Sequence, residues 1–264
     1  MFIFFLENNN SNCTFVYIYF RMNLVVDVGN TLIKLAVFEQ NRLVHKQVSI
    51  KSDFNRHLEV ILEDFPKIEK AILSLVGSFS DKNITKLEKL FKLHILTPAS
   101  KIPFINDYTT PQTMGVDRIA LVSAAAKQYP GKNVLVIDMG TCITYDFIDT
   151  EGHFKGGAIS PGINMRYKAL NSFTERLPLL DANEPGNIIG NSTQSSIHSG
   201  VMFGVVNEID GIINHYRQEK EDLTVILTGG NAHFLRDRLK NSIFANSNFL
   251  LEGLNILLDL NQNT

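Results

Sequence analysis

An aspartate, a glycine and hydrogen-bonding side chains recur where a strand turns back in each half of the chain. Residues 27–31 read DVGNT and residues 138–142 read DMGTC. A glycine lets the backbone come close to a phosphate, and the amides that follow can donate hydrogen bonds to it. A carboxylate at a strand end can hold hydrated Mg²⁺, and Lys34 follows the first turn. One such motif is typical of an ordinary hairpin, but two facing across a cleft predict a nucleotide site.

A second group of polar residues leads into an alanine-rich stretch. Gly115, Val116, Asp117 and Arg118 stand at its start, and Tyr108 lies shortly before them. An aspartate in the first turn of a helix can simply stabilise the helix dipole, and the arginine can pair with a surface carboxylate. At a cleft, the aspartate can instead accept a hydroxyl proton while the arginine binds a carboxylate or phosphate. This cluster alone leaves both interpretations open.

Three further segments combine glycine with small or hydroxyl-bearing residues. Residues 156–162 (GGAISPG) are typical of a backbone-lined ligand wall or of close helix packing. Residues 190–200 place Thr193 near the start of a long helix, as part of a cap or as a contact to a polar substrate. Residues 227–231 (LTGGN) run into a Gly-Gly turn that suits the adenosine and phosphate side of a nucleotide.

Composition excludes several other classes of protein. The 264 residues are 44% hydrophobic and 20% charged with a net charge of −2, which is typical of a folded chain and gives no basic surface for nucleic acid. No stretch reaches the ~20 apolar residues of a membrane span. Cys13 and Cys142 lie too far apart in sequence to indicate a disulfide scaffold or a zinc site. A GxxxxGKS/T phosphate loop is absent. We therefore expect a cytoplasmic protein without nucleic-acid or membrane partners.

Hydrophobic spacing predicts a similar series of elements twice. The first series is a meander of strands over residues 23–28, 32–38 and 43–50, then a helix over 52–64, a strand over 70–76, a helix over 81–92, a strand over 94–97 and a helix over 116–128. The second is strands over 133–138, 143–148 and one ending near 159, a helix over 193–217, a strand over 225–227 and a helix over 230–239. This duplication predicts two α/β halves, residues 22–130 and 131–264, with a cleft between them.

Residues 1–21 do not belong to either series. Met22 stands directly before the first convincing strand, so one hypothesis is that translation starts there and that residues 1–21 are a spurious extension. The alternative is an extra edge strand over residues 15–20.

Taken in chain order, these motifs resemble the type III pantothenate kinases of the actin, sugar-kinase and heat-shock ATPase superfamily. The resemblance runs from Met22 to about Leu258, with Met114 where the family usually has leucine and Cys142 where it usually has alanine. It implies an α/β fold of two similar ribonuclease-H-like (actin-like ATPase) domains with a nucleotide cleft between them. It also implies ATP-dependent phosphorylation of pantothenate at its primary hydroxyl, the first step of coenzyme A biosynthesis.

The resemblance implies roles for individual positions. Asp117 resembles the general base, Asp138 the ligand of a monovalent cation (K⁺ or NH₄⁺), and Thr141 an ATP contact, with Mg²⁺ accompanying the nucleotide. The implied phosphate loop is Asp27, Val28, Gly29, Asn30, Thr31, Leu32, Ile33 and Lys34. The implied pantothenate site is Tyr108, Gly115, Val116, Asp117, Arg118 and Thr193. Family members are homodimers with this site at the subunit interface, so Thr193 is expected to serve the neighbouring subunit.

Two other functions use the same fold. A sugar or small-polyol kinase would share both phosphate turns but needs a sugar pocket, which Tyr108 and the Gly115–Arg118 cluster do not indicate. A non-catalytic, nucleotide-binding regulatory protein is the second alternative. The presence of Asp27, Asp117 and Asp138 together favours a catalytic protein over it.

Overall fold

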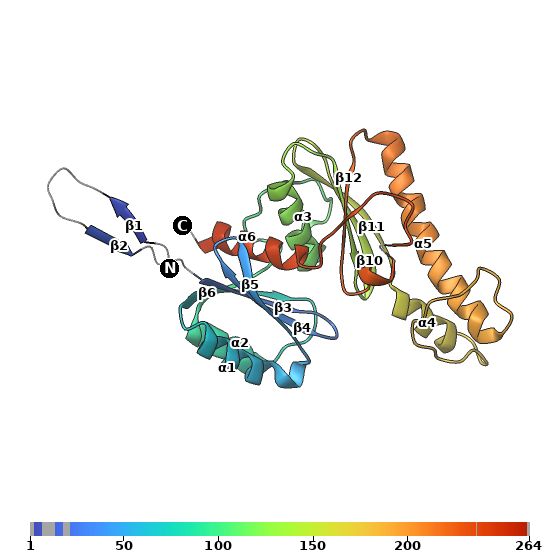
Figure 1. Cartoon of the computed structure of the whole chain (residues 1–264), viewed down its shortest axis with the longest axis horizontal. Helices are drawn as coiled ribbons and strands as arrows, with labels where there is room; N and C mark the ends of the chain where they lie inside the picture. Colours follow the sequence, from blue (N-terminus) through green and yellow to red (C-terminus); the bar gives the residue numbers. More distant parts are fainter. Residues whose placement is uncertain (1–2, 7–13, 18–21, 236, 263–264) are drawn as a thin grey trace.

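Two β-sheets of related topology form the framework of the molecule (Figure 1). The computed structural model describes residues 3–6, 14–17, 22–235 and 237–262. Within this part of the chain, no helix is long and apolar enough to cross a membrane.

The first sheet has five strands in the order β5-β4-β3-β6-β7. Its antiparallel meander and two parallel strands are β3 (Met22–Val28), β4 (Ile33–Glu39), β5 (Arg42–Ser49), β6 (Ile68–Leu75) and β7 (Lys92–Ile95). The apolar runs in β3 and β4 are buried on both faces of the sheet, as expected for central strands. Helices α1 (Phe54–Asp64) and α2 (Asp81–Leu90) cover one face.

The second sheet has six strands in the order β13-β12-β9-β10-β11-β8. They are β8 (Ile105–Asn106), β9 (Val134–Met139), β10 (Cys142–Ile148), β11 (His153–Pro161), β12 (Thr224–Thr228) and β13 (Phe244–Ala245). β9, β10 and β11 form a meander with β12 parallel to β9, as β3, β4 and β5 do with β6 parallel to β3. The strand pairings therefore confirm the expected duplication.

Two helices fill the space between the sheets. Helices α3 (Val116–Gln128) and α6 (Phe249–Gln262) share one hydrophobic core with Val25 of β3 and Val136 of β9. They cross so closely that a Cβ on Gly253 would lie 1.9 Å from the carbonyl oxygen of Ala120. The two helices therefore pack between the face of the first sheet that carries Val25 and the face of the second sheet that carries Val136.

The opposite face of the second sheet carries a different pair of helices. α4 (Ile163–Ser172) and α5 (Thr193–Glu219) pack on it, and they project from one side of the molecule in Figure 1. A capping box starts α5, because the Ser192 side chain accepts from the Ser195 backbone and the Ser195 side chain accepts from the Ser192 backbone.

Two predictions about elements are corrected, and one helix was not expected. The helix expected over residues 230–239 is only a 3₁₀ helix, Ala232–Phe234, followed by turns in its described part. The Asn231 amide donates to the Met139 carbonyl, which ties this segment to the neighbouring turn, and the bonds that follow are of the i→i+3 type. β7 begins two residues before the predicted strand. Helix α6 was not predicted as a helix.

The N-terminal segment forms a small sheet of its own. β1 (Ile3–Leu6) pairs antiparallel with β2 (Thr14–Tyr17). The described part of the expected edge strand therefore pairs with β1 and joins neither of the two main sheets, while residues 18–20 of that prediction and Cys13 lie outside the described residues. The start at Met22 and the boundary between residues 130 and 131 stay predictions.

Candidate active site

The two repeated aspartates occupy equivalent places in the two sheets. Asp27 is opposite Lys34 on β4 and Ser74 on β6, and Asp138 is opposite Thr144 on β10 and Thr228 on β12. Because side chains alternate along a strand, Asp27 shares the face of Val25 and Asp138 shares the face of Val136. These are the two faces that meet at the common core, so both carboxylates lie on the faces that look toward each other.

The first acidic turn holds its carboxylate firmly. Asp27 is 3% exposed and accepts from Lys34 Nζ at 3.2 Å and from Ser74 Oγ at 3.2 Å. Beyond it, the Gly29 amide donates to the Leu32 carbonyl at 3.0 Å, which closes the turn. Asn30 and Thr31 are exposed at the tip. A closed turn with exposed donors and a fixed cation beside it can take up phosphate oxygens.

The second acidic turn packs against the Gly-Gly turn after β12. Gly229 has a φ of +94°, and a Cβ there would lie 2.4 Å from Asp138 Oδ1. Burial raises the pKa of Asp138 to about 7, with Lys34 opposing the shift and the charges of Asp117 and Asp27 adding to it. Asp138 therefore lies within electrostatic range of the other half of the site. Thr141 is exposed at the tip of its turn.

Asp117 stands at the start of α3 with its carboxylate partly buried. Its Oδ1 accepts from the backbone N–H of Arg118 at 2.8 Å, and a Cβ on Gly115 would lie 2.4 Å from that oxygen. Glycine at the N-cap position therefore leaves room for the carboxylate. Burial raises the pKa of Asp117, the Arg118 amide lowers it, and the nearby charge of Asp27 raises it further.

Arg118 is buried and paired with a residue that was not among the predicted site residues. Its Nε and Nη2 lie 2.8 and 2.6 Å from Asp146 Oδ1, and its guanidinium lies 5.3 Å from the ring centre of Tyr108. Asp146 is fully buried in β10, on the same face as Asp138. The sequence carried one signal for it, because Asp146 is the one charged residue in the run CITYDFI.

Thr193 is not brought to this site within one chain. It is exposed at the first turn of α5, which packs on one face of the second sheet, whereas α3 with Asp117 packs on the other. Figure 1 shows α5 with its N-terminal end beside α4, at the edge of the molecule remote from α3. Of the residues implied for pantothenate, the structure gathers Tyr108, Gly115, Val116, Asp117 and Arg118 around the start of α3.

The charges of the site suit a metal-bound nucleotide. Among the described residues, the cations that act on Asp27, Asp117, Asp138 and Asp146 are Lys34 and Arg118. The described residues contain no group of three or more His, Cys, Asp or Glu side chains that could by itself enclose a metal. Mg²⁺ does not need such a cage, because it keeps several waters and binds through one or two carboxylates and substrate phosphates. The donor set therefore fits Mg²⁺ that is bound together with ATP.

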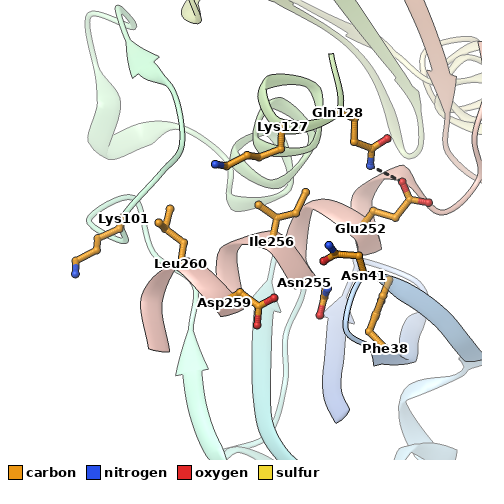
Figure 2. A pocket seen from close by; sticks show the side chains of 10 residues that line it. All are labelled: Phe38, Asn41, Lys101, Lys127, Gln128, Glu252, Asn255, Ile256, Asp259 and Leu260. Atoms are coloured by element: carbon orange, nitrogen blue, oxygen red, sulfur yellow. Dashed lines mark hydrogen bonds between the residues drawn. The ribbon is translucent and has the colours of Figure 1, made fainter. Parts of the chain in front are cut away.

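A cavity elsewhere in the molecule lies apart from this chemistry. It has a volume of about 870 Å³ and opens between the end of α3, α6 and β4, as Figure 2 shows. None of the described residues that line it was predicted for the site. Phe38, Ile256 and Leu260 supply its apolar wall, and Gln128 donates to Glu252 at its rim.

Two duplicated sheets with facing acidic turns define the two-domain actin-like fold. The fold agrees with a solved structure described as a putative Baf family transcriptional activator from Campylobacter jejuni, with a TM-score of 0.60, 20% identity, and coverage of 91% of this chain and 100% of that one. A glucokinase from an Antarctic psychrotroph gives a TM-score of 0.51 at 14% identity over 91% of this chain and 99% of its own.

Sequence comparison identifies the family within that fold class. The model of the family described as type III pantothenate kinase matches residues 23–215. A type III pantothenate kinase of Christiangramia forsetii is 52% identical over 91% of this chain and 99% of its own length. One of Flavobacterium johnsoniae is 49% identical over 88% and 96%. The chain belongs to the type III pantothenate kinase family.

Proposed function

We propose that Asp117 is the residue through which this chain carries out the ATP-dependent phosphorylation of pantothenate, the first step of coenzyme A biosynthesis. The observation that carries the assignment is its position. Asp117 is partly buried at the start of α3, close enough to both acidic turns for its charge to act on Asp138 and for that of Asp27 to act on it. A carboxylate so placed can align the primary hydroxyl of the substrate and accept its proton.

The two turns divide the binding of ATP between them. Phosphoryl transfer passes through a loose transition state, so positioning and neutralisation of charge supply most of the rate. Residues 27–34 offer the backbone amides of the first turn and Lys34 to the phosphates, and Thr141 contacts ATP from the second turn. Mg²⁺ bound with ATP neutralises phosphate charge. Asp138 is the proposed ligand of the monovalent cation, K⁺ or NH₄⁺, and its crowded carboxylate gives a reason for a cation there.

An assay of substrate choice tests this function. In a coupled ADP-release assay, we expect turnover with pantothenate, faster in K⁺ than in Na⁺, and no comparable turnover with a panel of sugars. Absence of turnover with pantothenate, or preference for a sugar, would contradict the proposal. The sugar-kinase alternative predicts the second result, and a regulatory protein predicts no turnover with any substrate.

We further propose that the enzyme is a homodimer in which Thr193 completes the substrate site of the neighbouring subunit. The placement of α5 and α3 on opposite faces of one sheet supports an action between subunits. The outer side of α5 supports it too, because a groove of about 440 Å³ runs beside Gly200 and Gly204, where an added Cβ would meet open space. Ile189, 83% exposed in the loop before α5, adds apolar area to this surface.

Mixing two inactive variants tests the shared site. Thr193→Glu keeps a residue that the first turn of a helix favours but repels an anionic substrate, and Asp117→Asn removes the base. Each variant alone should be nearly inactive. Unfolded together and refolded as an equimolar mixture, random pairing should restore about a quarter of the wild-type rate, because each mixed dimer has one intact site. No recovery in a mixture shown to contain mixed dimers would contradict the shared site.

We place the enzyme in the cytoplasm, where its substrate ATP is available, and we propose no nucleic-acid or membrane partner. The near-neutral net charge of −2 supports this part of the proposal.

A further inference from the structure

We propose that Asp146 is a positioning residue for the substrate, which fixes the guanidinium of Arg118 so that its remaining N–H groups recognise a carboxylate. The inference rests on the proposed function, because it assumes that Arg118 belongs to the pantothenate site. It adds a residue from the middle of β10 to a site otherwise built from turns and the start of a helix.

The Asp146 side chain is hydrogen-bonded to Arg118, and Thr144 on the same strand also interacts with its carboxylate. Its side chain is fully buried, and its Oδ1 takes both Arg118 Nε at 2.8 Å and Arg118 Nη2 at 2.6 Å. Within the described residues, its Oδ2 has no hydrogen-bond partner. The geometry of this carboxylate is therefore directed at the guanidinium rather than at the backbone or at other strands.

Two aromatic rings pack against the same guanidinium. The Arg118 Cζ lies 5.3 Å from the ring centre of Tyr108 and 5.7 Å from that of Phe154, and these two rings are stacked at 5.9 Å. A guanidinium has five N–H donors in a rigid plane. Asp146 takes two of them, and the Tyr108 side chain also interacts with the guanidinium, so its plane and the direction of the remaining N–H groups are set before substrate binds. A guanidinium whose N–H donors are already oriented is suited to bind the planar carboxylate of pantothenate.

The ion pair between Arg118 and Asp146 also connects carboxylate binding to the proposed base, Asp117. Asp117 and Arg118 are adjacent in the first turn of α3, and Asp146 ties that turn to β10. A buried ion pair is seldom the most stable choice, since apolar residues of similar volume often replace one without loss of stability. A role in orientation explains why a charged pair stands here in place of apolar packing.

Kinetics of a double-mutant cycle test the proposal. We expect Asp146→Asn and Arg118→Gln each to raise the KM for pantothenate at least about 10-fold, with the KM for ATP changed by less than about twofold. Because the first residue acts through the second, the double variant should be no worse than the more severe single variant. Asp149→Asn is the matched control. The Asp149 carboxylate follows β10 and accepts hydrogen bonds from the backbone N–H groups of Glu151 and His153 in the turn to β11, so its loss should leave both KM values within about twofold.

A second double variant addresses folding, because Asp146→Asn leaves a buried cation without its counter-charge. Arg118→Met with Asp146→Leu removes both charges, so it should fold with a near-normal Tm and keep the defect in the KM for pantothenate. If the increases in the KM for pantothenate of the two single variants multiply in the double variant, the proposal is overturned. So would a normal pantothenate KM in the Met/Leu variant. Wild type that fails to phosphorylate pantothenate would instead refute the proposed function, so the two failures are distinguishable.

Discussion

Replacing Asp117 with asparagine is expected to lower kcat by about 10²–10⁴-fold, which is the usual contribution of a positioned general base. The expected loss corresponds to roughly 3–5 kcal/mol of transition-state stabilisation. The amide keeps the shape of the carboxylate beside Gly115 and can still accept the Arg118 amide, so both substrates should bind with nearly unchanged KM. Steady-state kinetics with ATP and pantothenate varied separately provide the measurement.

The pH dependence of the wild type gives an independent check on this residue. Burial raises the pKa of Asp117, and only the ionised form accepts a proton. The acid limb of kcat should therefore lie above the range of an ordinary carboxyl group, with kcat rising as the pH increases through it. Asp64→Asn, at the exposed end of α1, is the matched control and should retain full activity. Near-normal turnover by the Asp117 variant would remove Asp117 from the role of base.

Replacing Asp138 with alanine is expected to weaken ATP binding and to abolish activation by K⁺. Loss of a contact between a charged group and its partner costs ~2 kcal/mol, or about 30-fold in affinity. The carboxylate belongs to the second turn and fills the space that Gly229 leaves free, so its removal affects nucleotide binding more than pantothenate binding. ATP titration and initial rates in Na⁺ and in K⁺ measure both effects.

The control for the cation is a carboxylate outside the two acidic turns. Asp222→Ala, in the turn before β12, should keep both the affinity for ATP and the response to K⁺. Equal rates of the wild type in Na⁺ and K⁺ would count against Asp138 as the cation ligand. An Asp138→Ala variant that keeps its response to K⁺ would do the same.

The sequence by itself determined the architecture and the place of the two acidic turns. The apolar runs before Asp27 and Asp138 predict central strands, and the strand pairings confirm the repeated order. The alternation of side chains then determines which face each aspartate takes. The strong helical pattern over residues 116–128 likewise predicted α3 with its bounds. These features depend on residues that are close in sequence, so local patterns are enough to reveal them.

Only the tertiary structure decided which distant groups meet. Arg118 could pair with a surface carboxylate as far as the sequence shows, yet it pairs with Asp146 in the buried core of the second sheet. The segment after Gly229 has a helix-like sequence, but in the fold it forms only a short 3₁₀ helix, and its Asn231 amide bonds to the Met139 carbonyl of the neighbouring turn. The sequence left Thr193 as either a helix cap or a substrate contact, and the fold places its helix behind the sheet. Such contacts join residues far apart in the chain, and their energies depend on burial and geometry that no local pattern records.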